Sequence, residues 1–190
     1  IGDGSMKVIV GWQKNQRKEF GDIINPDDYG LYFVLNTINY DLNYNFPEKK
    51  NYNFSIGVNG MFQTSQNKGT EYLVPEYSLF DVGVYGLISK SINKLDLSGG
   101  LRYDHRNETG QELILNSEGV EINEPQLGSI QKFNSFDSDF GSMSGSLGAT
   151  YQLSEILYTK LNVSSGFRAP NIAELGSNGE HEGSGRYEIG

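Results

Sequence analysis

Apolar and polar residues alternate along most of this chain with a period of two. In residues 94–106 one alternate set is mainly apolar and the other mainly polar. The first set is Leu95, Leu97, Gly99, Leu101 and Tyr103, and the second is Asp96, Ser98, Gly100, Arg102 and Asp104. A period of two is typical of a β-strand with one apolar and one polar face. The pattern fits a soluble sheet over a core and also a membrane barrel with a wet lumen.

Six further segments carry the same alternation, which predicts an antiparallel sheet of about seven strands. The predicted strands lie at about residues 7–20, 31–46, 52–63, 80–88, 94–106, 140–153 and 156–167. The clean alternation in 31–46 is the longest, and at about 3.3 Å per residue it would extend about 50 Å. This exceeds most strands of soluble sheets and suffices to cross a bilayer at a tilt.

The connections between the predicted strands alternate between short and long. Short turns fall at residues 47–51, 90–94 and 153–156, and long loops at about 20–30, 63–77 and 107–138. An up-and-down meander with all its tight turns on one side, as in outer-membrane barrels, has this order. A soluble Greek-key sandwich is not expected to sort its loops in this way. The sequence therefore favours an all-β antiparallel meander that forms part of a transmembrane barrel.

Composition narrows the classes of protein further. The 190 residues include 24 Gly, 12 Tyr and 10 Phe, which suits many strands with aromatic girdles. A net charge of −9 argues against nucleic acid as a partner, because phosphate neutralisation needs a basic face. The absence of cysteine argues against a disulfide scaffold or a thiolate metal site. No apolar run of 18 residues is present, which excludes a transmembrane helix but not a transmembrane strand, which needs only about 10 alternating residues.

Four separated segments resemble the barrel of TonB-dependent outer-membrane receptors, and they occur in the order of that family. They are W-Q-K-N-Q-R-K-E-F at 12–20, the segment 60–77, G-G-L-R-Y-D-H-R at 99–106, and the tail 162–190 with its F-R-A-P box and R-Y-E-I-G element. The resemblance implies a 22-stranded barrel filled by an N-terminal plug domain. Neither the plug nor the box that contacts TonB is recognisable here. Residues 1–190 are therefore expected to be a partial barrel domain from a longer protein, with a further external loop at about 169–186.

The resemblance implies that the protein actively takes up a scarce nutrient across the outer membrane of a Gram-negative bacterium. The ligand expected from it is an iron chelate, haem or a metal ion. The expected partners are the lipid bilayer and the TonB complex, the latter through parts outside this chain. No reaction is catalysed and no cofactor is expected.

His181 is the candidate ligand residue that the resemblance brings forward. Haem- and zinc-type members of the family are similar in placing a histidine between the F-R-A-P box and the following strand. Imidazole suits Zn²⁺ and haem iron, and the flanking carboxylates of Glu180 and Glu182 could complete a metal site. Many relatives place a second histidine where this chain has Glu182. A surface-loop histidine between solvated glutamates is the alternative.

Arg168 of the F-R-A-P box is a further ligand-binding candidate, although its main expected role is to orient the end of the strand. Pro170 and Asn171 predict a strand terminator followed by a turn. Three pairs of opposite charge lie two residues apart and are predicted to form ion pairs that face the lumen. They are Arg17 with Glu19, Arg102 with Asp104, and Arg186 with Glu188.

An enzyme is not expected. Asp104 and His105 are neighbours on one strand and point to opposite faces, so they cannot form a catalytic dyad. No sequence pattern of a serine hydrolase, a zinc protease or a phosphate-binding loop is present. Asp137 and Asp139 could hold calcium with other oxygens, and an ordinary solvated turn is the alternative.

A soluble all-β binding or adhesive module is the remaining rival. In that case one apolar face of the strand at 31–46 would pack against a second sheet, whereas in a receptor it would face lipid. That face consists of Tyr32, Val34, Ile38, Tyr40 and Leu42. In isolation, a partial barrel is expected to leave two sheet edges unpaired and to associate or swap through them.

Overall fold

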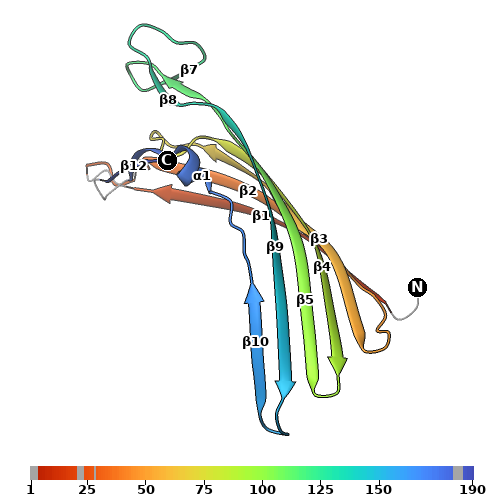
Figure 1. The fold of residues 1–190 in the computed structure, drawn as a ribbon. Helices are drawn as coiled ribbons and strands as arrows, with labels where there is room; N and C mark the ends of the chain where they lie inside the picture. The colour runs from red at the N-terminus through yellow and green to blue at the C-terminus, as the bar shows by residue number, and fades with distance from the viewer. Residues whose placement is uncertain (1–3, 21–23, 28, 182–185) are drawn as a thin grey trace.

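The computed structural model contains one antiparallel sheet of seven long strands (Figure 1). The structure describes residues 4–20, 24–27, 29–181 and 186–190. In spatial order the strands are β1 (Ser5–Glu19), β2 (Leu31–Asn45), β3 (Tyr52–Asn67), β4 (Tyr77–Ile92), β5 (Leu95–Gly110), β9 (Phe136–Gln152) and β10 (Tyr158–Ser164). The predicted fold class, an all-β antiparallel meander that forms part of a barrel, is confirmed. The sheet does not close on itself within the described residues, so β1 and β10 lie at its edges.

Tight turns collect at one end of the sheet, here called the turn end, where β2 meets β3, β4 meets β5, and β9 meets β10 (Figure 1). The first two turns contain residues with positive φ, namely Lys50 (54°), Asn51 (62°) and Asn93 (52°). Asparagine tolerates this left-handed conformation better than most residues, which explains its use in the turns. The opposite end, here called the loop end, carries all the remaining connections.

Short elements decorate the loop end. Between β5 and β9, a three-stranded sheet projects beyond the main sheet and is formed by β6 (Leu113–Leu115), β7 (Glu121–Ile122) and β8 (Ile130–Phe133) (Figure 1). After β10 come α1 (Ile172–Gly176), β11 (Asn178–His181) and β12 (Arg186–Ile189). The sequence analysis did not anticipate these elements. No helix in the described part of the chain is long and apolar enough to span a membrane.

Strand register separates an outer face from an inner face. On the outer face Leu42 pairs with Val58, and Val58 with Val84. On the inner face, one position away, Asp41 pairs with Asn59. Because side chains alternate across a strand, these pairings place the apolar sets of all the strands together and the polar sets together.

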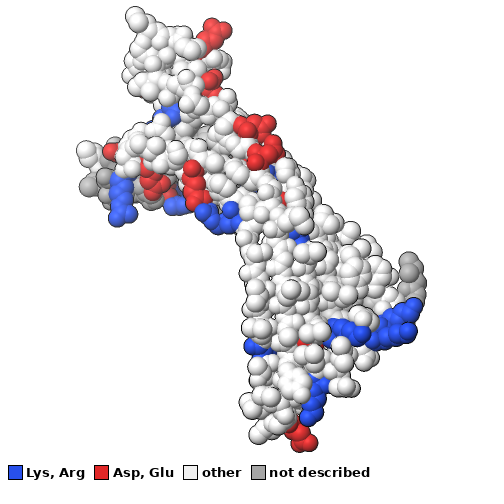
Figure 2. All heavy atoms as spheres, viewed as in Figure 1, with Lys and Arg blue, Asp and Glu red and all other residues white. Residues whose placement is uncertain are grey.

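Large apolar side chains on the outer face are exposed. Val10 on β1, Leu101 on β5 and Leu147 on β9 have 71%, 66% and 73% of their surface exposed. Contiguous apolar surface of this extent is characteristic of a face that meets lipid or another protein. Figure 2 shows the charged residues gathered toward the two ends of the strands, with an uncharged stretch between them. This distribution suits a sheet that crosses a bilayer.

No second sheet covers the outer face within the described ranges, which argues against the soluble module. Ile38 and Leu42, which a second sheet would bury, are 44% and 40% exposed. The expectation that Val34 also faces lipid is wrong, because Val34 is buried at the loop end. Its register neighbours there are Gln16 and Gln66, whose side chains lie on the same face.

The hydrophobic core lies at the loop end rather than between the strands. Leu31, Phe33 and Leu73 form its centre, with Leu35 and Val74 packed against them. The loop that follows β3 folds back onto the start of β2, where the backbone N–H of Lys68 donates to the Tyr32 carbonyl at 2.7 Å. This core fixes the loop end, where the candidate site lies.

Gly60 on β3 allows a close approach between strands and leads to a first prediction. The Tyr40 ring crosses over it, and the Tyr40 hydroxyl donates to the Asp81 carbonyl oxygen at 2.7 Å. A Cβ at Gly60 would collide with both groups. Gly60→Ala is therefore expected to cost about 1–3 kcal/mol, measured by urea unfolding of the full-length parent in lipid vesicles.

Gly11→Ala on β1 is the matched control for Gly60→Ala. A Cβ at Gly11 would meet no atom of the described residues within 4 Å. Alanine there also reduces the entropy of the unfolded chain, so the stability is expected to stay constant or rise slightly. Equal losses for the two variants would contradict the close approach at Gly60.

Candidate functional site

Charged side chains on the inner face form ion pairs, one across neighbouring strands and one along a single strand. One pair joins Arg106 on β5 to Asp81 on β4, which lie directly opposite in the register. Arg106 donates from Nε to Asp81 Oδ1 and from Nη2 to Asp81 Oδ2, both at 2.7 Å. A two-pronged contact of this kind is among the stronger polar contacts in proteins and fixes both side chains.

A second pair lies on the same face, two residues nearer the turn end of β5. Arg102 Nε donates to both carboxylate oxygens of Asp104, at 2.7 and 2.8 Å, and Arg102 Nη2 donates to Asn59 Oδ1 at 2.8 Å. Gly83 on β4 leaves the space that the guanidinium fills, since a Cβ there would collide with it. The predicted ion pair between Arg102 and Asp104 is confirmed.

The other two predicted charge pairs have different outcomes. Arg17 and Glu19 form an ion pair on β1, as predicted. Arg186 and Glu188 lie on β12, which pairs with β11 in a separate two-stranded sheet. Their mutual ion pair stays a prediction.

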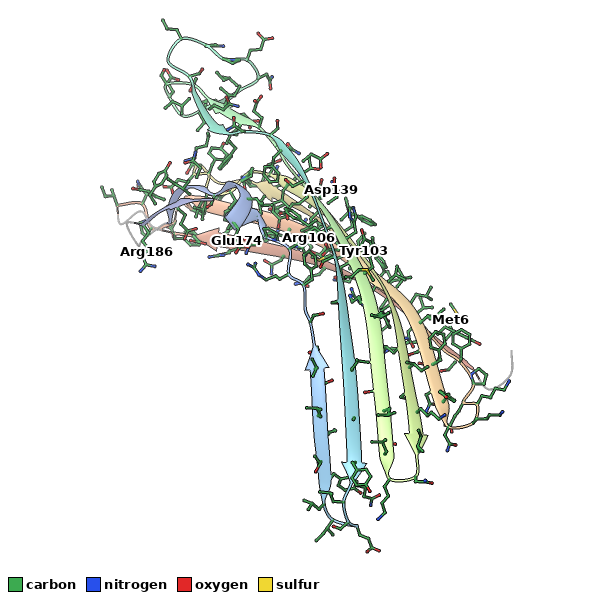
Figure 3. All side chains as sticks on the ribbon, viewed as in Figure 1. Met6, Tyr103, Arg106, Asp139, Glu174 and Arg186 are labelled. Atoms are coloured by element: carbon green, nitrogen blue, oxygen red, sulfur yellow. The ribbon has the colours of Figure 1, made fainter. Side chains whose placement is uncertain are left out.

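The segment after β10 passes over the inner face and forms one wall of an open cavity of about 640 Å³. Phe167, Arg168 and Ala169 form one side of this cavity, and residues of β2 to β5 form the other. Arg106 Nη1 donates to the Pro170 carbonyl at 3.3 Å and so ties the segment to the sheet. Figure 3 shows Arg106 and the α1 residue Glu174 together at the loop end.

Helix α1 begins where the F-R-A-P box ends, because Asn171 caps it. The Asn171 side-chain oxygen accepts from the backbone N–H of Glu174 at 3.1 Å, and the Glu174 carboxylate accepts from the backbone N–H of Asn171 at 2.9 Å. This reciprocal capping box stabilises the first turn of a helix that has only five residues. The turn predicted at Pro170 and Asn171 is thus the start of a helix.

Arg168 holds the same carboxylate from the other side. Its Nη1 and Nη2 donate to Glu174 Oε2 and Oε1 at 2.7 and 2.9 Å. These hydrogen bonds, followed by the bond from the Asn171 backbone, lower the pKa of Glu174 from its ordinary value to about 2. The contacts support the expected orienting role of Arg168, and its ligand-binding role stays a prediction.

A second prediction concerns the pH dependence of this helix. A carboxyl group whose pKa is lower in the folded loop contributes stability that is present above its unfolded pKa and is lost as the pH falls through the folded pKa. Protection of residues 171–177 from hydrogen exchange, corrected for the intrinsic rate, is therefore expected to decline between the ordinary pKa of 4.5 and about 2. Glu174→Gln should weaken protection at neutral pH and abolish this decline, whereas Glu118→Gln, on a separate loop, should change neither. If protection still declined with falling pH in Glu174→Gln, the decline would be due to the titration of a group other than Glu174.

Of the proposed ligand residues, Glu180 and the backbone of His181 lie on β11 at the loop end. Glu180 is exposed on β11, and the backbone of His181 pairs with Arg186 on β12. The His181 side chain and all of Glu182 fall outside the part of the chain that the structure describes. Within that part, no group of three or more histidine, cysteine or acidic residues is arranged to hold a metal ion. The metal and ligand roles of the three residues stay predictions.

Glu180 also has a basic neighbour. Burial lowers the pKa of Lys132 on β8, and the carboxylates of Glu71 and Glu180 oppose this shift. The Lys132 ammonium lies 5.8 Å from the centre of the Tyr187 ring. A cation bound by Glu180 would therefore meet repulsion from Lys132.

His105 and Asp104 point to opposite faces, as predicted. Asp104 binds Arg102 on the inner face, whereas His105 Nε2 lies 3.2 Å from Asp139 Oδ1 on the outer face. Next to it, Asn107 Nδ2 donates to Asp137 at 2.7 Å and to Asp139 at 3.3 Å. An amide therefore bridges the two carboxylates that were considered for calcium.

Sequence reasoning missed Asp81, Arg106 and Glu108. Glu108 is completely buried at the loop end, and neither of its carboxylate oxygens has a hydrogen-bond partner among the described residues. The two-residue turn at Asn93 and Lys94 was a usable signal, because counting outward from it brings Asp81 opposite Arg106. Alternation from Arg102 and Asp104 also places Arg106 and Glu108 on the inner face.

A comparison with protein families identifies the class of this chain. The family model described as "TonB dependent receptor-like, beta-barrel" matches residues 8–190. The chain therefore belongs to this family of TonB-dependent receptor β-barrels. Comparisons with curated proteins and with solved structures gave no match.

Family membership establishes the general function. The chain is a segment of the barrel of an outer-membrane receptor for nutrient uptake, and its family consists of transporters. Such receptors bind a nutrient ligand and the TonB protein and lie in the outer membrane of Gram-negative bacteria. The exposed outer face of the sheet agrees with this membrane location.

Proposed function

We propose that this receptor takes up an iron chelate, haem or a metal ion, with an iron chelate as the principal candidate. The observation that supports it is the cavity of about 640 Å³ between the sheet and the segment Phe167–Ala169. Its volume lies in the range of small-molecule sites, about 300–1,000 Å³. Its wall carries fixed charged and amide groups that can orient a polar ligand.

The residues proposed to contact the ligand follow β10 in the sequence. Arg168 lines the cavity directly. Glu180 is exposed on β11, and its carboxylate, with the imidazole of His181 and the carboxylate of Glu182, provides ligand atoms that suit iron or zinc. Together these residues form the proposed ligand-contact segment.

The test uses the full-length parent in its own outer membrane. Cells receive radioactive ferric iron in several chelated forms, or haem, or zinc, with and without an energised inner membrane. Energy-dependent accumulation of at least one iron form is the expected result. Accumulation of none of them would contradict the proposed function.

Single substitutions then test the individual residues. If His181 ligates the metal, His181→Ala is expected to reduce accumulation about ten-fold or more. Loss of a group that merely supports a metal ligand already lowers metal affinity or activity by about ten-fold or more, and loss of the ligand itself should cost at least as much. Glu118→Gln, which removes an exposed carboxylate on another loop, is the matched control. Unchanged uptake in His181→Ala would contradict the role of His181 while leaving the function in place.

A further inference from the structure

The cavity's arginines offer no free positive charge. Arg102, Arg106 and Arg168 all line the cavity, and each is already bound to a carboxylate by two hydrogen bonds. Their carboxylate partners are Asp104, Asp81 and Glu174. A ligand carboxylate or catecholate would have to displace one of these partners before it could bind a guanidinium in the same way.

Asp41 on β2 is the cavity residue whose charge is not balanced. It lines the cavity, and its carboxylate makes no hydrogen bond or ion pair with any residue that the structure describes. Its register neighbour Asn59 is engaged by Arg102, which is itself bound to Asp104. The unbalanced charge of this wall is therefore negative.

The uncharged polar side chains that the inner face contributes to the wall are amides. Asn39 lies two residues before Asp41 on β2, Asn59 lies opposite Asp41 on β3, and both line the cavity. Amides donate and accept hydrogen bonds without a net charge. They suit a ligand whose surface consists of amide, hydroxamate or hydroxyl oxygens.

We infer that the cavity selects a neutral or positively charged hydroxamate-type iron chelate, and rejects anionic chelates and haem with its propionate groups. This inference rests on the proposed function and names the substrate class of the same site. An anionic ligand would bring its charge toward the unpaired Asp41 carboxylate. At an effective dielectric constant of about 40, a unit charge 5 Å away changes the binding constant about ten-fold.

The experiment measures binding of defined ferric complexes to the full-length receptor in isolated outer membranes. The probes are a neutral cyclic trihydroxamate, a cationic linear trihydroxamate, a tricatecholate trianion, an anionic dicitrate complex and haem. The first two are expected to bind at least about ten-fold more tightly than the other three. Tighter binding of any anionic probe would overturn the inference while the proposed function stands.

Two variants connect the selectivity to Asp41. Asp41→Asn keeps the size of the side chain and is expected to remove the preference for the cationic over the neutral probe. Asp41→Arg is expected to strengthen binding of the anionic probes about ten-fold. Asp96→Asn is the matched control, because Asp96 lies on the inner face at the turn end and outside the cavity. Two measurements check that each variant is folded and present in the membrane. One is the heat-dependent change in its migration on a denaturing gel, and the other is the amount of receptor at the cell surface.

The outcomes separate the inference from the function. If both Asp41 variants kept the same selectivity for the neutral and cationic probes, the role of Asp41 would be overturned. The inference would fail with it. Failure of every iron probe to bind, with binding of a neutral oligosaccharide instead, would overturn both the inference and the proposed function.

Discussion

Arginine in place of Leu147 is expected to lower the free energy of unfolding of the membrane-inserted barrel by about 2–4 kcal/mol. Leu147 lies on the outer face of β9, is 73% exposed, and pairs with Gly99 on β5 and Val163 on β10. If this face meets lipid, a guanidinium there loses its hydration and has no partner. Urea unfolding of the full-length parent from lipid vesicles measures the loss.

Ser146→Arg is the matched control for Leu147→Arg. Ser146 is the preceding residue on β9, and its side chain points to the inner face opposite Gly100. A charge in a wet lumen keeps its hydration, so the expected loss is below about 1 kcal/mol. Equal losses at the two positions, or a larger loss at Ser146, would contradict the assignment of the faces.

Arg106→Ala is expected to cost about 3 kcal/mol, the lower end of the cost of breaking a buried ion pair. The side chains of Arg106 and Asp81 are only 20% and 23% exposed, so the unpaired Asp81 carboxylate is poorly hydrated. Arg106 also attracts the buried carboxylate of Glu108 and binds the Pro170 carbonyl. One substitution therefore leaves two carboxylates without their cation and frees the segment over the cavity. The loss is measured by urea unfolding.

Arg17→Ala provides the comparison for Arg106→Ala. Arg17 also forms an ion pair with a carboxylate, that of Glu19, but its side chain is 61% exposed. Exposed pairs contribute about 0.2–1 kcal/mol, so a small loss is expected. Similar losses for Arg17→Ala and Arg106→Ala would contradict the structural role assigned to the pair on β4 and β5.

The strands and their faces could be predicted because alternation is a local property. Leu95, Leu97 and Leu101 share a face wherever the strand lies in the sheet, and the spacing of Arg102 and Asp104 brings their side chains together on one strand. The short turns then specify the order of the strands. These features need no knowledge of distant contacts.

The loop end could not be predicted in the same way, because its packing depends on contacts between distant segments. Leu31 and Phe33 occupy the otherwise polar inner face, and they are buried because Leu73 folds back over them. Helix α1 has only five residues, too few for a hydrophobic period to reveal. The cavity depends on the segment around Phe167 crossing the sheet, which no local pattern indicates.

Labelling of single cysteines tests the central claim, a receptor barrel wall with a lipid-facing outer face and a wet inner face. Residues 1–190 contain no cysteine, so once any cysteine elsewhere in the full-length parent is replaced by serine, each position from Leu95 to Asp104 can be labelled alone in its own membrane. The account predicts alternation, with the even-numbered positions such as Asp96 and Arg102 reached by a water-soluble reagent and Leu97 and Leu101 only by a lipid-soluble one. Protection of Leu97 and Leu101 from both reagents would show that they lie in a protein core, and would contradict the account.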